Sequence, residues 1–188
     1  MQPKNPVVIL ALICILDLSC NNKKHFIIED IEAPQNIVII PDSIHKKQML
    51  FSLVNEMSSV SKLESEYIGF DGHRSLQPNY SAQLARLADT GYILSLVKHS
   101  TPIVRIIAVE SLVELKYPDL RLVFLKLIND KDTYTFQSGC MAGPIPINIA
   151  CYSSISTRLT EKEKHKYKSE LMRQYKNTGF EYLLRFDY

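Results

Sequence analysis

The chain has 188 residues, of which 46% are hydrophobic and 22% are charged, a composition that excludes a disordered chain and allows one domain with a buried core. Its 22 basic and 20 acidic side chains leave a net charge of +2, so the overall charge gives no argument for nucleic acid as a partner. Four cysteines are too few for a disulfide-dense small domain, and the composition therefore predicts an ordinary globular protein.

The first twenty residues have the three parts of a secretory signal peptide. Lys4 and the free amine supply positive charge, residues 7–16 form an unbroken apolar run, and the small Ser19 precedes Cys20. A ten-residue helix spans about 15 Å, roughly half of the hydrocarbon core of a bilayer, so this run is too short to cross a membrane permanently. We therefore predict a signal peptide over residues 1–19.

The sequence Leu-Asp-Leu-Ser-Cys at residues 16–20 resembles the lipobox of bacterial lipoproteins, in which the cysteine becomes the first residue and its thiol is diacylated. Lipoboxes that end in Ser-Cys are familiar from Bacteroidetes lipoproteins, and the departure here is Asp17, where the motif usually has leucine. The resemblance implies that Cys20 attaches the protein to membrane lipid in the cell envelope. An ordinary cleaved signal and an uncleaved N-terminal anchor are the alternatives.

Residues 20–43 form the predicted lipidated tether. Residues 21–24 are Asn-Asn-Lys-Lys, a polar and basic start that suits an exposed segment next to a membrane. Surface-exported lipoproteins of the Bacteroidetes group are acidic at this place, so the resemblance implies a lipoprotein that faces the periplasm.

Residues 44–188 have apolar side chains at helical spacing, which predicts one helical domain. Asp42 or Ser43 can cap the first helix, prolines stand at the start of two later ones, and Thr160 can cap the last. The expected helical stretches are residues 45–60, 80–99, 102–116, 118–128 and 161–176. Two intervening segments, residues 67–78 and 137–148, contain several glycines and prolines and are expected to be irregular loops.

One of these stretches resembles the second helix of HEAT-type repeats, which commonly reads Pro-x-Val-Arg-x-x-Ala-x-x-x-Leu. The matching residues are Pro102, Val104, Arg105, Ala108 and Leu112. A wider similarity over residues 67–155 is to a group of HEAT-like proteins of Bacteroidetes. The resemblance implies an all-α fold, a short α-solenoid of stacked helix pairs, in which Arg105 has a structural role and bonds to a nearby turn carboxylate or carbonyl.

Cys140 and Cys151 are the cysteines that remain after the signal peptide and Cys20 are set aside. In an oxidising periplasm they could form a disulfide, and the alternative is two buried free thiols that act as small apolar residues. The five histidines are well separated and show no metal-binding spacing. The sequence therefore predicts no metal, no cofactor and no catalytic residue.

Because no reactive constellation is visible, we expect a non-enzymatic, membrane-anchored lipoprotein that presents its helical-repeat surface to another envelope protein. One alternative is an envelope enzyme, or a subunit of one, with a site formed by the 67–78 and 137–148 loops. A structural or envelope-maintenance role, including immunity to a toxin, is the other.

Overall fold

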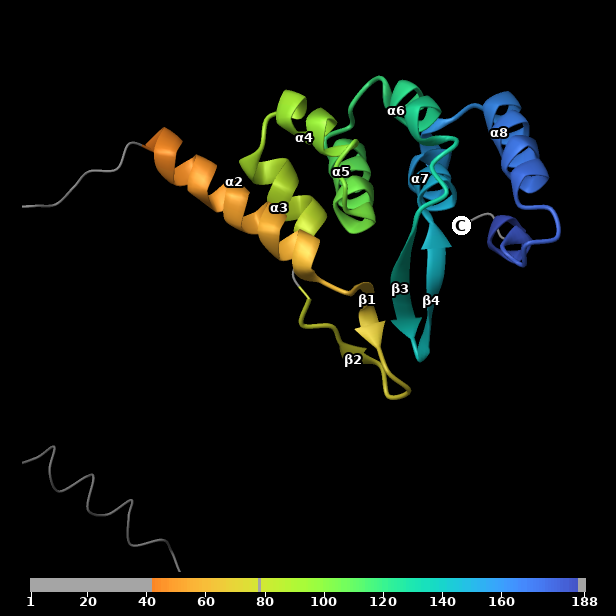
Figure 1. Ribbon diagram of the computed structural model, residues 1–188, viewed down its shortest axis with the longest axis horizontal. Coiled ribbons are helices and arrows are strands. Elements are labelled where there is room, and N and C mark those ends of the chain that lie inside the picture. Colours follow the sequence, from red (N-terminus) through yellow and green to blue (C-terminus); the bar gives the residue numbers. More distant parts are fainter. Residues whose placement is uncertain (1–41, 78, 186–188) are drawn as a thin grey trace, which may run out of the picture. The chain divides into compact units, whose positions relative to one another are not determined.

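The structure is a computed structural model that describes residues 42–77 and 79–185 (Figure 1). The predicted signal peptide, Cys20 and the tether up to residue 41 lie outside the described residues. In chain order the elements are α2 (Asp42–Ser59), β1 (Lys62–Ile68), β2 (His73–Arg74), α3 (Tyr80–Leu87), α4 (Thr90–Leu96), α5 (Pro102–Glu114), α6 (Leu120–Leu127), β3 (Thr133–Gly139), β4 (Met141–Pro146), α7 (Ile147–Ile155), the 3-10 turn η2 (Ser156–Arg158), α8 (Glu161–Gln174) and the 3-10 turn η3 (Glu181–Leu184).

The expected all-α solenoid is wrong. The described residues contain seven α-helices and a four-stranded mixed sheet, so the fold combines helices and strands. Strands β2 and β4 lie within the segments 67–78 and 137–148 that were expected to be loops, and β1 and β3 end inside them. The helices themselves lie close to the expected stretches, because their apolar spacing and caps are local signals.

The sheet has the order β2-β1-β3-β4. Its two central strands, β1 and β3, run parallel, with Leu63 opposite Phe136 and Ile68 opposite Gly139. A parallel pair needs a long crossover connection, and here helices α3 to α6 supply it. The sheet therefore depends on a pairing between distant segments, and the residues of β1 show no local pattern that predicts this pairing.

The segment 137–148, expected to be an irregular loop, is largely a β-hairpin. β3 and β4 are antiparallel and are joined by Gly139 and Cys140, with Ser138 opposite Met141. Gly139 has a φ of +54°, a conformation that suits glycine at the first position of a tight hairpin turn. Prolines are tolerated in β4 because it is an edge strand, where one row of backbone groups has no partner strand in the sheet.

The segment 67–78 also contains β structure. β1 turns into the two-residue strand β2 through residues 69–72, and Gly69 and Gly72 both have positive φ angles, of +79° and +67°. The turn chemistry predicted for this segment is therefore present, but the turn joins two strands of the sheet.

Helix α5 lies at the centre of the helical part and packs against α2, α3, α4, α6, α7 and strand β3. Its residues from Ile103 to Val109 are all buried, together with Ser111 and Leu112. Leu115, just after its last turn, is 42% exposed. A helix that is apolar all round belongs inside a core, and α5 has that position.

Helix α8 confirms the predicted start at Thr160. The Thr160 side chain accepts a hydrogen bond from the backbone of Glu163, and the Glu163 carboxylate accepts one from the backbone of Thr160, which completes a capping box. Tyr167 and Leu171 of α8 and Tyr175 after it are buried and form the inner face of this helix.

Candidate functional site

Arg105, from the repeat-like motif, is buried and joins two turns. Its Nη1 donates to the backbone carbonyls of His99 and Ser100 at 2.8 and 3.1 Å. Its Nη2 donates to Oδ2 of Asp132 at 2.6 Å, and Nε lies 3.0 Å from Oδ2 of Asp130. The Nε–H is poorly aligned with that oxygen, so this contact is an ion pair, and Nη2 also donates a long hydrogen bond to Oδ1 of Asp130 at 3.4 Å. These hydrogen bonds and ion pairs fix α5 to the turn before it and to the turn that precedes β3.

The other motif residues lie in the same helix. Pro102 is the first residue of α5, where its missing N–H leaves no hydrogen bond unmade. Val104, Ala108 and Leu112 are fully buried. None of them lines either of the two cavities described below, so the motif residues contribute to the core and not to these cavities.

The structure does not bring Cys140 and Cys151 together. Cys140 is exposed at the turn of the β3–β4 hairpin, whereas Cys151 is fully buried in α7. The six residues of β4 separate the turn from the start of α7, and a strand of that length spans about 20 Å. Both thiols are free.

The larger of the two cavities lies between the sheet and the helices and has a volume of about 800 Å³. Strands β1, β2 and β3 form one side, the segment from residue 75 to the start of α3 forms another, and α5 closes it. The residues that line it are Leu63, Glu64, Ser65, Glu66, Arg74, Ser75, Leu76, Gln77, Asn79, Tyr80, Ser81, Ile107, Glu110, Tyr134 and Phe136.

Glu110 is the carboxylate that α5 contributes to this cavity. Burial, followed by the negative charge of Glu114 one turn further along the helix, raises the pKa of Glu110 to about 7. No hydrogen bond or ion pair joins its carboxyl group to another residue within 42–77 or 79–185. Its charge is therefore uncompensated by the protein around it.

Tyr134 of β3 lies close to Glu110, and its hydroxyl group likewise has no hydrogen-bond partner among the described residues. Its side chain is only 9% exposed, and no described residue forms a hydrogen bond with its hydroxyl group. Burial and the nearby Glu110 raise the pKa of Tyr134 above its usual value, so it stays protonated. A partly buried acid and a buried tyrosine, neither with a hydrogen-bond partner for its side chain among the described residues, thus line the same cavity, and their polar atoms are open to its solvent.

The other two acids of the cavity wall differ from Glu110 because each has partners. The Ser75 hydroxyl donates to Glu64 at 2.7 Å and Lys62 lies 3.0 Å away, and these hydrogen bonds lower the pKa of Glu64. Glu66 forms an exposed ion pair with Arg74 at 3.6 Å. The two carboxyl groups on opposite walls, Glu64 and Glu110, therefore have pKa values shifted in opposite directions.

Tyr80, at the start of α3, also lines this cavity, and burial raises its pKa as it does for Glu110 and Tyr134. Its hydroxyl donates to Glu56 of α2 at 3.0 Å, and burial together with that carboxylate raises its pKa to about 12. The aromatic rings of Tyr80, Tyr134 and Phe136 give the cavity three aromatic walls.

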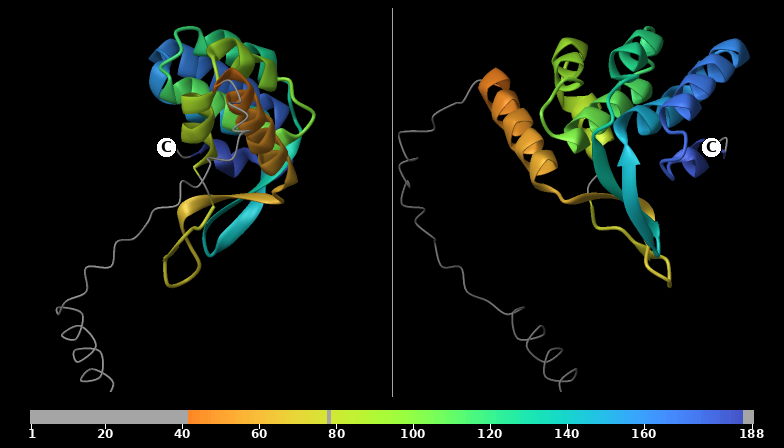
Figure 2. Two further views of the ribbon diagram at one scale, coloured as in Figure 1. Left: turned by 90° about the vertical axis from the view of Figure 1, so that its left-hand side faces the viewer. Right: turned by 45° about the vertical axis from the view of Figure 1, so that its right-hand side comes forward.

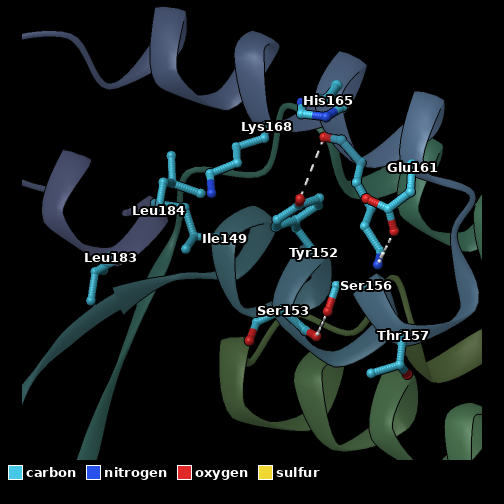
Figure 3. Close-up of a pocket in the computed structure, with 11 residues that line it drawn as sticks. Ile149, Tyr152, Ser153, Ser156, Thr157, Glu161, His165, Lys168, Leu183 and Leu184 are labelled. Atoms are coloured by element: carbon cyan, nitrogen blue, oxygen red, sulfur yellow. Dashed lines mark hydrogen bonds and ion pairs between the residues drawn. The ribbon is translucent and has the colours of Figure 1, made fainter. Parts of the chain in front are cut away.

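A smaller cavity of about 360 Å³ lies between α7, α8 and η3 (Figure 3). Much of its polar surface is already paired: Lys164 forms an ion pair with Glu161 at 2.7 Å, and the Tyr152 hydroxyl lies 3.4 Å from the carbonyl of Lys164. Lys168 and Tyr152 have further interactions within the chain. This cavity is a crevice beside the basic helix α8, and its lysines, Glu161 and Tyr152 are already engaged within the chain.

The two turns of the sheet meet at one end, away from the helices (Figures 1 and 2). The backbone N–H of Gly69 donates to the carbonyl of Gly139 at 2.9 Å and so joins them. We call this end the sheet tip and define it by its exposed large residues, Tyr67, Phe70 and Met141. Their side chains are 55%, 97% and 75% exposed.

The segments 67–78 and 137–148, which the sequence offered as one enzyme site, meet at the sheet tip and not at a cavity. Residues 74–77 line the larger cavity, but none from 137–148 does. Sequence reasoning missed Glu110 and Tyr134. Glu110 is an acid inside an apolar helix and could have been noticed there, whereas its closeness to Tyr134 depends on how α5 meets β3.

Comparison with protein-family models, curated proteins and solved structures finds no match for this chain. Within residues 42–77 and 79–185, no three histidine, cysteine, aspartate or glutamate side chains are grouped so that they could hold a metal ion. No helix in this part of the chain has the length and apolar character needed to span a membrane. The candidate sites are therefore the larger cavity and the sheet tip.

Proposed function

We propose that the protein is a lipoprotein of the bacterial cell envelope, attached to membrane lipid through Cys20 and facing the periplasm, that binds another envelope protein through the sheet tip. The observation that carries this proposal is the exposure of Phe70 and Met141, at 97% and 75%, on two turns that a backbone hydrogen bond joins. The proposed binding surface is therefore this end of the sheet, and not the helical-repeat surface that the sequence led us to expect.

Exposed aromatic and methionine side chains support a protein partner, because these residue types are enriched at the centres of protein interfaces. Charged pairs lie beside them: Asp71 contacts His73 at 2.9 Å, and Arg74 contacts Glu66 at 3.6 Å. An apolar centre with a polar surround is the usual composition of an interface. The hairpins hold this surface on hydrogen-bonded strands, so little conformational entropy is lost when a partner binds.

The test of the partner is affinity capture from detergent-solubilised envelope with the full chain as bait. We expect a stoichiometric protein partner whose recovery falls at least tenfold when Phe70→Ser and Met141→Ser are combined. Leu122→Ser is the matched control, because Leu122 is a 50% exposed apolar residue on α6, away from the sheet. Equal recovery with the tip variant, or binding of lipid vesicles in place of a protein, would contradict the proposal.

The test of the anchor is metabolic labelling with radioactive palmitate. Wild-type protein should incorporate the label and remain in the membrane fraction, whereas Cys20→Ala should lose both properties because the thiol that carries the lipid is absent. Equal labelling of the two proteins would show that the attachment does not use Cys20.

A further inference from the structure

We propose that the larger cavity binds a small organic cation, with its ammonium group held between the Glu110 carboxylate and the Tyr134 hydroxyl and its apolar part against Phe136 and the neighbouring apolar wall. None of the sheet-tip residues lines this cavity, so the inference stands apart from the proposed protein-binding role.

The first step is the uncompensated acid. A carboxylate that is withdrawn from much of the surrounding water gains from a cation or hydrogen-bond donors beside it, because even partial burial of an isolated charge is costly. Glu64, whose side chain is 15% exposed, has Lys62 and Ser75 beside it, whereas no described residue supplies such a partner to the partly buried Glu110. An ammonium group that enters the cavity supplies the missing charge and up to three N–H donors.

The second step is the tyrosine. The Tyr134 hydroxyl oxygen has two lone pairs, and its proton remains in place because burial raises the pKa of the group. One N–H of a bound ammonium can therefore point to Tyr134 while another points to Glu110. Since no described residue forms a hydrogen bond with either group, both can bond to a ligand in the cavity that they line.

The third step is the sign of the charge. Among the residues that the structure describes, three carboxylates and one cation line the cavity, and this cation, Arg74, is 77% exposed and already pairs with Glu66. An anionic ligand would meet repulsion from Glu64 and Glu110. A cation would also gain from the rings of Tyr80, Tyr134 and Phe136, because aromatic faces attract positive charge.

The fourth step is size. A volume of about 800 Å³ is within the range typical of small-molecule sites. Leu63, Ile107 and Phe136 supply apolar surface in the same cavity, which suits a short alkyl chain attached to the ammonium group. The ligand class is therefore an alkylammonium compound.

The site makes binding depend on pH. Glu110 must be ionised to hold an ammonium group, so affinity should fall as the pH drops below about 7. Between pH 8 and pH 5, with the amine charged throughout, the loss should be on the order of tenfold or more. Glu114 on its own helix and Tyr134 on β3 interact electrostatically with Glu110. The other charged and titratable groups of the cavity lining are Glu64 and Glu66 on β1, Arg74 on β2 and Tyr80 on α3.

The experiment is isothermal titration of the full chain, in detergent, with n-butylammonium chloride at pH 8 and pH 5. The matched neutral probe is 1-butanol, which has the same alkyl chain and a hydroxyl group. We expect n-butylammonium to bind at pH 8 with a Kd of about 10 mM or tighter, as a ligand of so few atoms allows, and at least tenfold more tightly than 1-butanol.

Two variants locate the site. Glu110→Gln keeps the shape of the side chain and should weaken binding at least tenfold, and Tyr134→Phe should weaken it severalfold by removing one hydrogen-bond acceptor. The control is Glu114→Gln, one turn along α5 and outside the cavity lining, which should bind within about twofold of wild type because Glu114 does not contact the ligand.

Three results would overturn the inference: no heat of binding up to about 50 mM n-butylammonium, a concentration well above the expected Kd, equal binding of 1-butanol, or unchanged affinity in Glu110→Gln. If Glu110→Gln fails to fold, the decision passes to Tyr134→Phe and to the pH dependence of the wild-type protein. Affinity that is equal at pH 5 and pH 8 then refutes the role of Glu110.

Discussion

The guanidinium group of Arg105 lies 2.6 Å from the Asp132 carboxylate and so joins α5 to the turn that precedes β3. The same turn also holds the start of α7, because the carbonyls of Asp132 and Asp130 accept hydrogen bonds from the backbone N–H groups of Ile147 and Asn148 at 2.8 and 3.1 Å. Arg105 therefore fixes the position of α5, β3 and α7 relative to one another. These elements also position Glu110 and Tyr134 at the cavity.

We predict that Arg105→Ala lowers the free energy of unfolding by about 3 kcal/mol, because it leaves the Asp130 carboxylate and two backbone carbonyls without their buried donor. Urea denaturation followed by circular dichroism measures the change. Arg121→Ala is the control: Arg121 is 56% exposed and pairs with Glu163 at 3.4 Å, so its loss should change the stability by less than about 1 kcal/mol. Equal effects of the two substitutions would contradict the structural role of Arg105.

The raised pKa of Glu110 predicts a loss of stability with rising pH. The carboxyl group takes up a proton more readily in the folded state, at a pKa of about 7, than in the unfolded state, where its pKa is the ordinary 4.5. Between these values the folded state binds more protons, so the free energy of unfolding falls as the pH rises through this window. From pH 5 to pH 8 we expect Glu110 to contribute a loss of about 2 kcal/mol.

Glu110→Gln isolates this contribution. The neutral amide has no proton to lose, so the variant should be more stable than wild type at pH 8 by about 2 kcal/mol, and the two proteins should converge towards pH 5. Urea denaturation at the two pH values gives both numbers. A variant that is less stable than wild type at pH 8 would mean that the Glu110 carboxylate has a stabilising partner in solution.

Local signals explain why the helices could be predicted and the sheet could not. The Thr160–Glu163 capping box and the proline that opens α5 are determined by residues within one turn of the helix start. Strand β1 has no comparable signal, because Leu63 is its only buried residue and polar residues fill most of the rest. Its place in the sheet comes from pairing with β3, a contact between distant segments.

The β3–β4 hairpin is a different case, because the sequence contains a hairpin pattern, but the prolines in β4 favoured a loop. Tyr134 and Phe136 alternate with polar residues, and Gly139 stands at the first position of a two-residue turn. The prolines at 144 and 146 favoured a loop, which would be correct for a central strand but not for an edge strand. The cavity follows from this hairpin, since Tyr134 and Phe136 form part of its wall.

The capping box of α8 predicts a modest effect of Thr160→Ala. The substitution removes the hydroxyl that accepts the backbone N–H of Glu163, and it should lower the free energy of unfolding by about 1 kcal/mol. Chemical denaturation measures this change. Thr157→Ala is the matched control, because Thr157 is exposed and its side chain forms no hydrogen bond among the described residues, so the stability should stay within about 0.5 kcal/mol of wild type.

The two domain cysteines are expected to differ strongly in reactivity. Cys140 is exposed at the hairpin turn, so iodoacetamide should modify it in the native protein, whereas Cys151 should stay unmodified because it is fully buried and burial raises the pKa of its thiol. Mass spectrometry of proteolytic peptides identifies each site, and Cys140→Ser should abolish the native-state labelling. After denaturation without a reductant, both thiols should react. Protection of both under those conditions, relieved by a reductant, would mean that they are joined as a disulfide, which requires β4 and α7 to be arranged differently from the fold described above.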